Sequence, residues 1–529
     1  MIDRLLAGLP AINLRLRKYR RWGLSAEPAR RILQRVLTVG VLLAAAVVRL
    51  SALLTFGLNS DEAVYSGQAA ALASDPVLSD LFPVFRAHPL LFHFTLSLFF
   101  RLGVSELTGR LLVALTGILT VYLVYRLGVE LYGRQAGIIA AIILALMPYH
   151  VVVTRQVLLD GPMTMFATLS ALFLARFGRN GQPADLYAAG ASIGVTFLTK
   201  EAGVLFLGAT YVFFALSPNI RVRIRDLLIS AAIALTLMSL YPLTVTVAGT
   251  GASNTAQQYL LWQFFRFPNH TADFYLRTVP FELGLLVVFL ALLGFWTLRK
   301  ERSWPETLLG AWIVVPVVFF QLWPTKGYQY LLPIAPAVAL LAARTLVGIF
   351  ENRAPARSPG VPGWLLPAAL SVVAFSLLVP TFLVVFPQPA AESLAGSGGV
   401  PGGREAGLWV HDNLPEGSTL MTIGPSMANI LQFYGHHRAL GLSVSANPLY
   451  RNPAYTPIDN PDLQIRLGEI QYLVWDAFSA NRSEFFSARL LDYVQKYDGR
   501  VAYTETIPVR TAGGAVIEEP VIIIYRVYP

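Results

Sequence analysis

Long runs of apolar residues, separated by short polar stretches, fill most of the chain up to residue 387. A helix needs about 20 such residues to cross the hydrocarbon core of a membrane, so each long run predicts a membrane-spanning helix. One run, 89–100, is too short to cross and is expected to lie on the membrane surface or to re-enter it. The others predict about eleven spans, at 36–56, 109–127, 135–153, 161–176, 186–199, 202–217, 227–247, 281–298, 306–323, 328–349 and 364–387.

The pattern changes after residue 387. Pro, Gly and Ser are frequent in residues 388–403, which is typical of a linker. Beyond the linker, residues 404–529 are long enough for one small domain. The sequence therefore predicts an all-α polytopic membrane domain at 35–387, followed by a small soluble α/β domain. The latter contains strand-like runs at 419–423, 472–475 and 521–527 and helix-like runs at 427–434 and 484–497.

Composition supports the membrane assignment. Hydrophobic residues make up 55% of the chain and charged residues only 14%, against about 25% in soluble proteins. These values exclude a soluble enzyme, a disordered chain and a fibrous repeat. The chain has no cysteine, which excludes disulfides, thiolate metal sites and cysteine nucleophiles.

The distribution of charge predicts the orientation. Residues 1–387 contain 31 Lys and Arg against 17 Asp and Glu, whereas residues 388–529 contain 10 against 14. The basic segment 1–34 is expected to lie on anionic lipid at the cytoplasmic face of the membrane. Loops rich in Lys and Arg are expected on the same face. Every second loop between the eleven spans is basic, so the C-terminal domain and the loop 57–108 are expected outside the cytoplasm. Membrane lipids are expected partners and nucleic acids are not, because the Arg residues lie in short loops between apolar runs.

Three acids in the loops expected outside are candidates for catalysis. Asp61 and Glu62 follow the first span, and Asp160 precedes the fourth. A carboxylate held at a membrane boundary can act as a general base or a metal ligand. The alternative is a structural one, in which Ser60 or Asp61 caps a helix at 62–73 and Asp160 caps the next span.

Cations on the same face are candidates for binding an anionic group. Lys200 lies where two short apolar runs meet, and it either pairs with Glu201 or binds a phosphate. Lys326 poses the same choice. Arg86, His88 and Arg155 are further candidates in this set.

The order of these features resembles the GT-C membrane glycosyltransferases, specifically the family of protein O-mannosyltransferases and aminoarabinose lipid A transferases. The resemblance covers roughly residues 36–350. It rests on Asp61-Glu62, His88-Pro89-Leu90-Leu91, Gly103-Val104-Ser105-Glu106 with Arg110-Leu111, Tyr132-Gly133-Arg134 with Ala136-Gly137, Arg155 to Asp160, Leu198-Thr199-Lys200 and Tyr330-Leu331-Leu332-Pro333.

The resemblance implies that a sugar is transferred with inversion from a polyprenyl-phosphate donor to a protein, lipid or glycan acceptor on the external face. It implies that Asp61 is the catalytic acid of the first external loop and that Glu62 is its neighbour. Asp160 matches the external acid before the fourth span, and Lys200 matches a basic residue near the lipid phosphate.

One family feature is missing. The aminoarabinose enzymes carry Glu-Lys-Pro before the short amphipathic helix, whereas this chain has Ala87-His88-Pro89. The acid that helps to bind metal there is absent, so we assign no metal ligands and no certain cofactor, with a divalent metal ion left as an alternative.

Two other functions compete with glycosyl transfer. A polytopic transporter or a flippase for lipid-linked sugars would show paired repeats and ionisable residues near the bilayer midplane, and the sequence shows no clear repeat. A non-catalytic glycan-binding or assembly factor is disfavoured only by the resemblance, which retains both Asp61 and Asp160.

Overall fold

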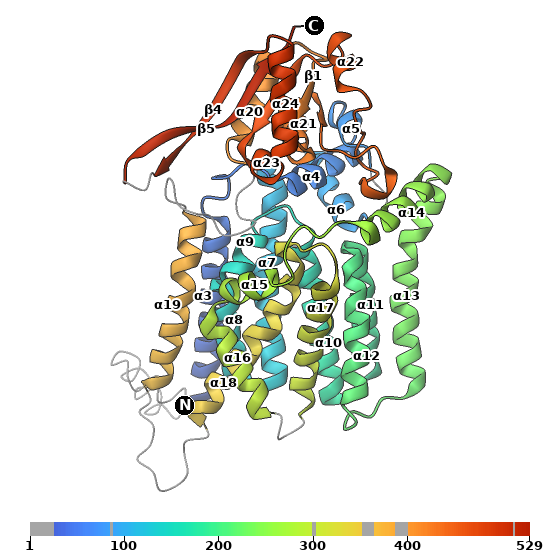
Figure 1. Ribbon diagram of the computed structural model, residues 1–529. Coiled ribbons are helices and arrows are strands. Elements are labelled where there is room, and N and C mark those ends of the chain that lie inside the picture. Colours follow the sequence, from blue (N-terminus) through green and yellow to red (C-terminus); the bar gives the residue numbers. More distant parts are fainter. Residues whose placement is uncertain are drawn as a thin grey trace.

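The computed structural model describes residues 26–84, 88–298, 303–351, 364–386, 400–510 and 514–528. A bundle of long helices lies at one end, and a smaller domain with a β-sheet covers the other end (Figure 1). Most of the predicted segment 1–34 and of the predicted linker 388–403 falls outside the described residues.

Helices of the bundle coincide with all of the predicted spans. By length and apolar composition, six described helices can each cross a membrane, or seven if the pair α15–α16, bent by 98°, is one span. The protein is therefore a multi-pass membrane protein, and the number eleven stays a prediction. The elements are α3 (Ala26–Leu50), α7 (Glu106–Tyr132), α8 (Arg134–Leu146), α9 (Pro148–Val153), α10 (Asp160–Asn180), α11 (Pro183–Thr199), η1 (Glu201–Val204), α12 (Leu205–Leu216), α13 (Ile224–Val247), α15 (Phe274–Leu283), α16 (Leu285–Leu298), α17 (Trp304–Leu322), η2 (Tyr328–Ile334), α18 (Ala335–Glu351) and α19 (Leu365–Val385).

Proline explains why one predicted span is two helices. The run 135–153 is divided into α8 and α9 at Met147, which has an extended backbone and precedes Pro148. A residue before proline avoids the helical conformation, and Pro148 is well suited to the first turn of the next helix. The break turns the chain toward Asp160.

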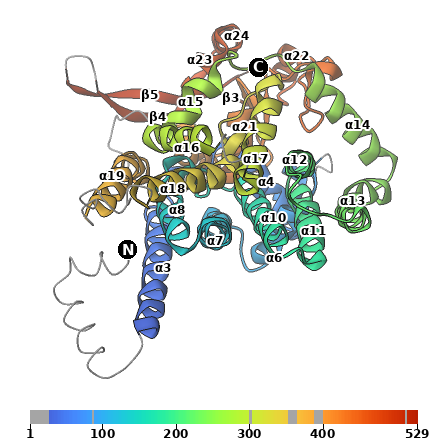
Figure 2. The ribbon, with the colours of Figure 1, turned by 90° about the horizontal axis from the view of Figure 1, so that it is seen from below.

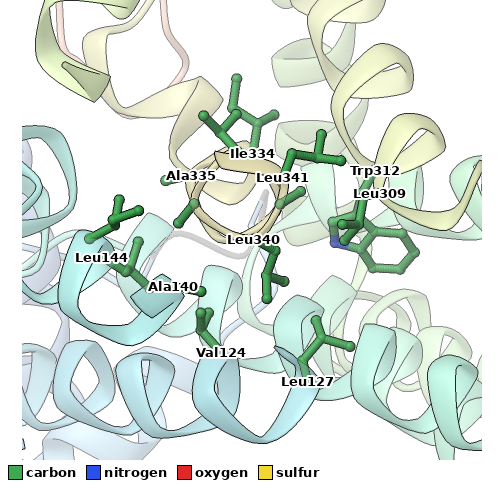
Figure 3. Close-up of a cluster of buried hydrophobic side chains, with 14 of the residues drawn as sticks. Val124, Leu127, Ala140, Leu144, Leu309, Trp312, Ile334, Ala335, Leu340 and Leu341 are labelled. Atoms are coloured by element: carbon green, nitrogen blue, oxygen red, sulfur yellow. The ribbon is translucent and has the colours of Figure 1, made fainter. Parts of the chain in front are cut away.

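Helix α18 forms the centre of the bundle. All residues from Leu331 to Ala343 are buried, whereas only five residues of α19 are. Ile334, Ala335, Leu340 and Leu341 pack against side chains of α7, α8 and α17 (Figure 3). From below, α3 and α19 lie on one side of the bundle and α13 on the other, so these helices form its edges (Figure 2).

Four helices lie between the bundle and the smaller domain or beside it: α4 (Ser60–Leu72), α5 (Leu78–Leu81), α6 (Leu91–Phe100) and α14 (Thr250–Phe265). Helix α6 matches the short run 89–100. Its 10 residues extend about 15 Å, half of a hydrocarbon core of about 30 Å, so it cannot cross. It packs on α4, α7 and α11 instead.

The C-terminal domain is a five-stranded sheet with helices, as the sequence predicted. The strand order is β2-β1-β3-β5-β4, with parallel pairing among β2, β1 and β3 and antiparallel pairing of β5 with β3 and β4. All three predicted strands and both predicted helices form. The elements are α20 (Gly403–Asn413), β1 (Thr419–Thr422), α21 (Pro425–Gly435), β2 (Arg438–Gly441), η3 (Pro448–Tyr450), α22 (Pro461–Arg466), β3 (Tyr472–Asp476), α23 (Ala477–Arg482), α24 (Glu484–Lys496), β4 (Arg500–Arg510) and β5 (Val516–Arg526).

The C-terminal domain is docked firmly on the helices that precede it. One continuous cluster of buried apolar side chains includes Leu58 and Phe92 from the bundle side and Ile430 from α21. An ion pair of 2.8 Å joins Arg404 to Glu106, which also bonds to the Tyr434 hydroxyl. The two parts therefore share a core, and α21 lies directly on α4.

Candidate active site

The first turn of α4 presents Asp61. Asn59 caps this helix: its side chain accepts from the Glu62 N–H at 3.0 Å, and the Asn59 N–H donates to Glu62 Oε2 at 3.0 Å. The prediction that Ser60 or Asp61 is the cap is therefore wrong by one or two residues. Because Asn59 caps the helix, the exposed Asp61 carboxylate is not used for capping. Its Oδ2 accepts from Gln329 Nε2 at 3.5 Å.

Glu62 is a buried anchor. It is 1% exposed, and its carboxylate accepts from Arg110 Nε at 3.0 Å and Nη2 at 3.1 Å. It also accepts from the Val157 N–H at 2.8 Å. These donors take up the oxygens of Glu62, and its catalytic role stays a prediction. Glu62 joins α4, α7 and the loop that leads to Asp160.

Asp160 and Lys200 form a buried ion pair. Lys200 Nζ lies 2.8 and 2.9 Å from the two carboxylate oxygens, and the residues are 1% and 8% exposed. Lys200 also lies 4.7 Å from the centre of the Tyr330 ring. The alternative in which Lys200 pairs with Glu201 is wrong, because Glu201 lies 3.1 Å from His88 Nδ1 instead. Asp160 lies in the first helical turn and does not cap it with its side chain.

The positive charges around Asp61 come from three separate segments. Solvent reaches Asp61, but protein atoms surround much of its carboxyl, and this enclosure raises its pKa. The positive charges of Lys200, Arg266 and His88 counteract part of that rise. Arg266 follows α14 and stacks over the Trp262 ring at 4.2 Å. Arg266 is not among the predicted cations; its signal in the sequence is a cation beside aromatic residues in a long loop expected outside. The structure thus brings Asp61, Asp160, Lys200 and His88 together, with Arg266 added.

Two predicted phosphate-binding cations have another use. The Arg155 guanidinium donates to four carbonyl groups at the end of α3, those of Val48, Arg49, Ser51 and Ala52, over 2.7–3.1 Å. Lys326 Nζ donates to three carbonyls at the end of α17, over 2.7–3.0 Å. Carbonyls at a helix end lack partners within the helix, so these cations complete α3 and α17. Arg86 lies outside the described residues.

The site does not fit a resident metal ion. Within the described ranges, no three or more His, Asp or Glu side chains are placed to hold one. Both oxygens of Asp160 already face the Lys200 ammonium. The residues described at this site therefore offer no complete ligand set for a metal ion.

The comparisons support the resemblance to the GT-C membrane glycosyltransferases that the motifs indicate. Residues 87–245 match the model of the dolichyl-phosphate-mannose-protein mannosyltransferase family. The chain is also 29% identical over 147 residues to the Bacillus subtilis protein named "Putative mannosyltransferase YycA". That match covers 28% of this chain and 21% of the relative's length.

Solved structures share the fold over nearly the whole chain. ArnT from Cupriavidus metallidurans, bound to undecaprenyl phosphate, superposes with a TM-score of 0.61 at 17% identity, over 92% of this chain and 97% of that one. The oligosaccharyltransferase AglB from Archaeoglobus fulgidus, in complex with an inhibitory peptide and a dolichol-phosphate, gives 0.52 at 15% identity, over 93% and 74%. At these identities the likeness concerns the fold alone.

Proposed function

We propose that this protein transfers a sugar, with inversion, from a polyprenyl-phosphate donor to a hydroxyl group of a protein, lipid or glycan acceptor. The observation that carries the proposal is the Asp61 carboxylate, which is exposed, is not used as a helix cap, and lies within electrostatic range of Lys200, Arg266 and His88. A base beside a set of cations is what removal of a hydroxyl proton and departure of a phosphate require.

Bond formation, proton transfer and departure of the phosphate occur in one step. The acceptor oxygen forms a bond to the anomeric carbon while its proton passes to Asp61. The bond from the anomeric carbon to the phosphate oxygen breaks, and its electron pair leaves with the polyprenyl phosphate. Because enclosure raises the pKa of the Asp61 carboxyl, Asp61 is a stronger base than a carboxylate in water.

The donor phosphate belongs beside Lys200, His88 and Arg266 in this proposal. Lys200 has three N–H groups, and Asp160 accepts two of them. Asp160 thereby holds Lys200 in place and balances its charge when no donor is bound. The prenyl chain would lie along apolar helices of the bundle, since both Asp160 and Lys200 lie at the ends of helices that the sequence predicts to span the membrane.

The arrangement of the loops supports an external site. The connections α7–α8, α10–α11 and α12–α13 lie at the end of the bundle away from the C-terminal domain (Figure 1). Arg221 lies in one of these connections, and Arg134 and Arg179 lie in the helix ends beside the other two. Since basic loops remain cytoplasmic, we place the N-terminus inside the cell and the C-terminal domain, with Asp61, outside.

Turnover of defined donors tests the proposal. The purified full-length protein is incubated in lipid nanodiscs with a panel of labelled polyprenyl-phosphate sugars, and release of polyprenyl phosphate is followed. We expect release with at least one donor, and a loss of about 10²–10⁴-fold in Asp61→Asn. Asp80→Asn, an exposed acid in the same loop, is the matched control and should keep wild-type activity. Wild-type transfer by Asp61→Asn, or no turnover of any donor, contradicts the proposal.

A further inference from the structure

One segment of the C-terminal domain reaches the surroundings of Asp61. Residues 442–460 connect β2 to α22 and contain η3. Within this segment, the ring of Tyr450 stacks on Phe267 with 5.0 Å between ring centres, and η3 packs on α14. Phe267 follows Arg266 directly, so the C-terminal domain helps to hold the backbone that carries Arg266.

The second contact of this segment runs through Asn429. This side chain is 4% exposed, and its amide nitrogen donates to Ser60 Oγ at 3.0 Å and to the Tyr455 hydroxyl at 3.2 Å. An amide nitrogen has two N–H groups, and both are used here. The Tyr455 hydroxyl is thus tied, through one side chain, to the residue that precedes Asp61.

The Tyr455 hydroxyl has a proton to donate. It accepts a hydrogen bond from Asn429, so its own proton points away from that amide. Burial raises the pKa of the Tyr455 phenol, which keeps it protonated at neutral pH. The charged groups within electrostatic range of this phenol are Asp61 and Arg266.

The two substrates must approach from opposite sides. Inversion requires the acceptor oxygen to attack the anomeric carbon from the face opposite the leaving phosphate. The donor is a membrane lipid, so its phosphate comes from the side of the bundle, where Lys200 and Asp160 lie. The C-terminal domain lies on the other side of α4 (Figure 1). The acceptor therefore has to enter from the side of α4 that faces the C-terminal domain.

We propose that the Tyr455 hydroxyl binds the acceptor, donating a hydrogen bond to an oxygen adjacent to the hydroxyl that Asp61 deprotonates. The C-terminal domain thereby forms the acceptor side of the active site, and the acceptor carries a second oxygen next to the hydroxyl that reacts. This inference rests on the proposed glycosyl transfer.

Competition between an added alcohol acceptor and water for the donor sugar tests this inference. Full-length protein in nanodiscs, with the donor that it turns over, receives soluble methyl glycosides as probe acceptors, while water competes as the alternative acceptor. Tyr455→Phe removes one oxygen and keeps the ring. We expect its acceptor KM to rise about 3- to 10-fold, as for loss of one neutral hydrogen bond, with donor KM and donor hydrolysis unchanged. Tyr525→Phe, on β5, is the matched control and should equal the wild type.

The outcomes separate the two proposals. If the wild type neither hydrolyses nor transfers any donor, glycosyl transfer falls, and this inference falls with it. If the wild type transfers but Tyr455→Phe has the acceptor KM of Tyr525→Phe, only the role of Tyr455 is refuted. If Tyr455→Phe loses hydrolysis and transfer to the same extent, Tyr455 maintains structure and does not bind the acceptor, which also refutes the inference.

Discussion

Replacing Glu62 by alanine should destabilise the protein strongly. The change leaves the guanidinium of Arg110, which is 3% exposed, without its counter-ion, and it leaves the N–H of Val157 without an acceptor. Carbonyl groups of Leu53, Phe56 and Gly57 still accept from Arg110, but they carry no charge. Removal of one partner of a buried ion pair costs about 3–5 kcal/mol.

A surface acid provides the comparison. Glu130 pairs with the side chains of Arg176 and Arg179 at 3.8 and 3.3 Å, and its side chain is 20% exposed. The Arg179 side chain is 62% exposed, so solvent screens this interaction, and ion pairs near the surface contribute about 0–1 kcal/mol. We therefore expect Glu130→Ala to lower the unfolding midpoint only slightly. Glu62→Gln, which keeps size and one acceptor oxygen, should fall between Glu130→Ala and Glu62→Ala.

The assay is denaturant unfolding of the purified variants in one fixed detergent, followed by tryptophan fluorescence, with donor turnover measured under native conditions. Glu62→Gln should lose turnover out of proportion to its loss of stability, because Glu62 ties α4 to the loop that leads to Asp160. An unfolding midpoint for Glu62→Ala equal to that of Glu130→Ala would refute the reasoning about the buried pair.

Four further outcomes are expected. Only the ionised form of Asp61 accepts a proton, and enclosure raises the pKa of its carboxyl above the usual value of about 4. Acidification should therefore reduce transfer at a pH above about 4. Transfer that stays constant down to about pH 4 contradicts this. Lys200→Met should raise the donor KM and lower the unfolding midpoint, because it leaves Asp160 buried without a counter-ion. Adding Asp160→Asn should restore the unfolding midpoint but not the donor KM. Lys326→Met should lower the unfolding midpoint, since three carbonyls of α17 lose their donor, with donor KM unchanged. Reporter fusions after Arg225 and within the C-terminal domain should report opposite compartments, and cytoplasmic signals from both contradict the topology.

The helices and strands were largely predictable from the sequence because they depend on local patterns. Apolar runs gave the positions of the bundle helices, and the alternation of short runs gave strands β1, β3 and β5. Strands β2 and β4 were not predicted, and a length of four residues does not account for β2, since β1 has four residues as well. The break at Met147 was also missed, although Pro148 is a sufficient local signal for it.

Side-chain partners were less predictable because they depend on residues far apart in the chain. Asp160 and Lys200 were both identified as candidates, but their pairing joins positions 40 residues apart. Arg155 resembled a phosphate ligand in sequence, and only the position of the end of α3 shows that it caps that helix. Arg266 lacked any motif and becomes a candidate only once α14 brings it toward Asp61.

The docking of the C-terminal domain on α4 has a consequence for the order in which the protein matures. The contacts of Ser60 with Asn429 and of Leu58 with Tyr434 join residues 369 and 376 positions apart. Synthesis proceeds from the N-terminus, so the first turn of α4 must wait for the last quarter of the chain before its partners exist. During that interval the apolar surfaces of Leu58 and Phe92 have no cover from α21. The active site should therefore form only after the C-terminal domain has been synthesised. A chain that stops before this domain should be incompletely folded and degraded, and should not be a smaller active enzyme.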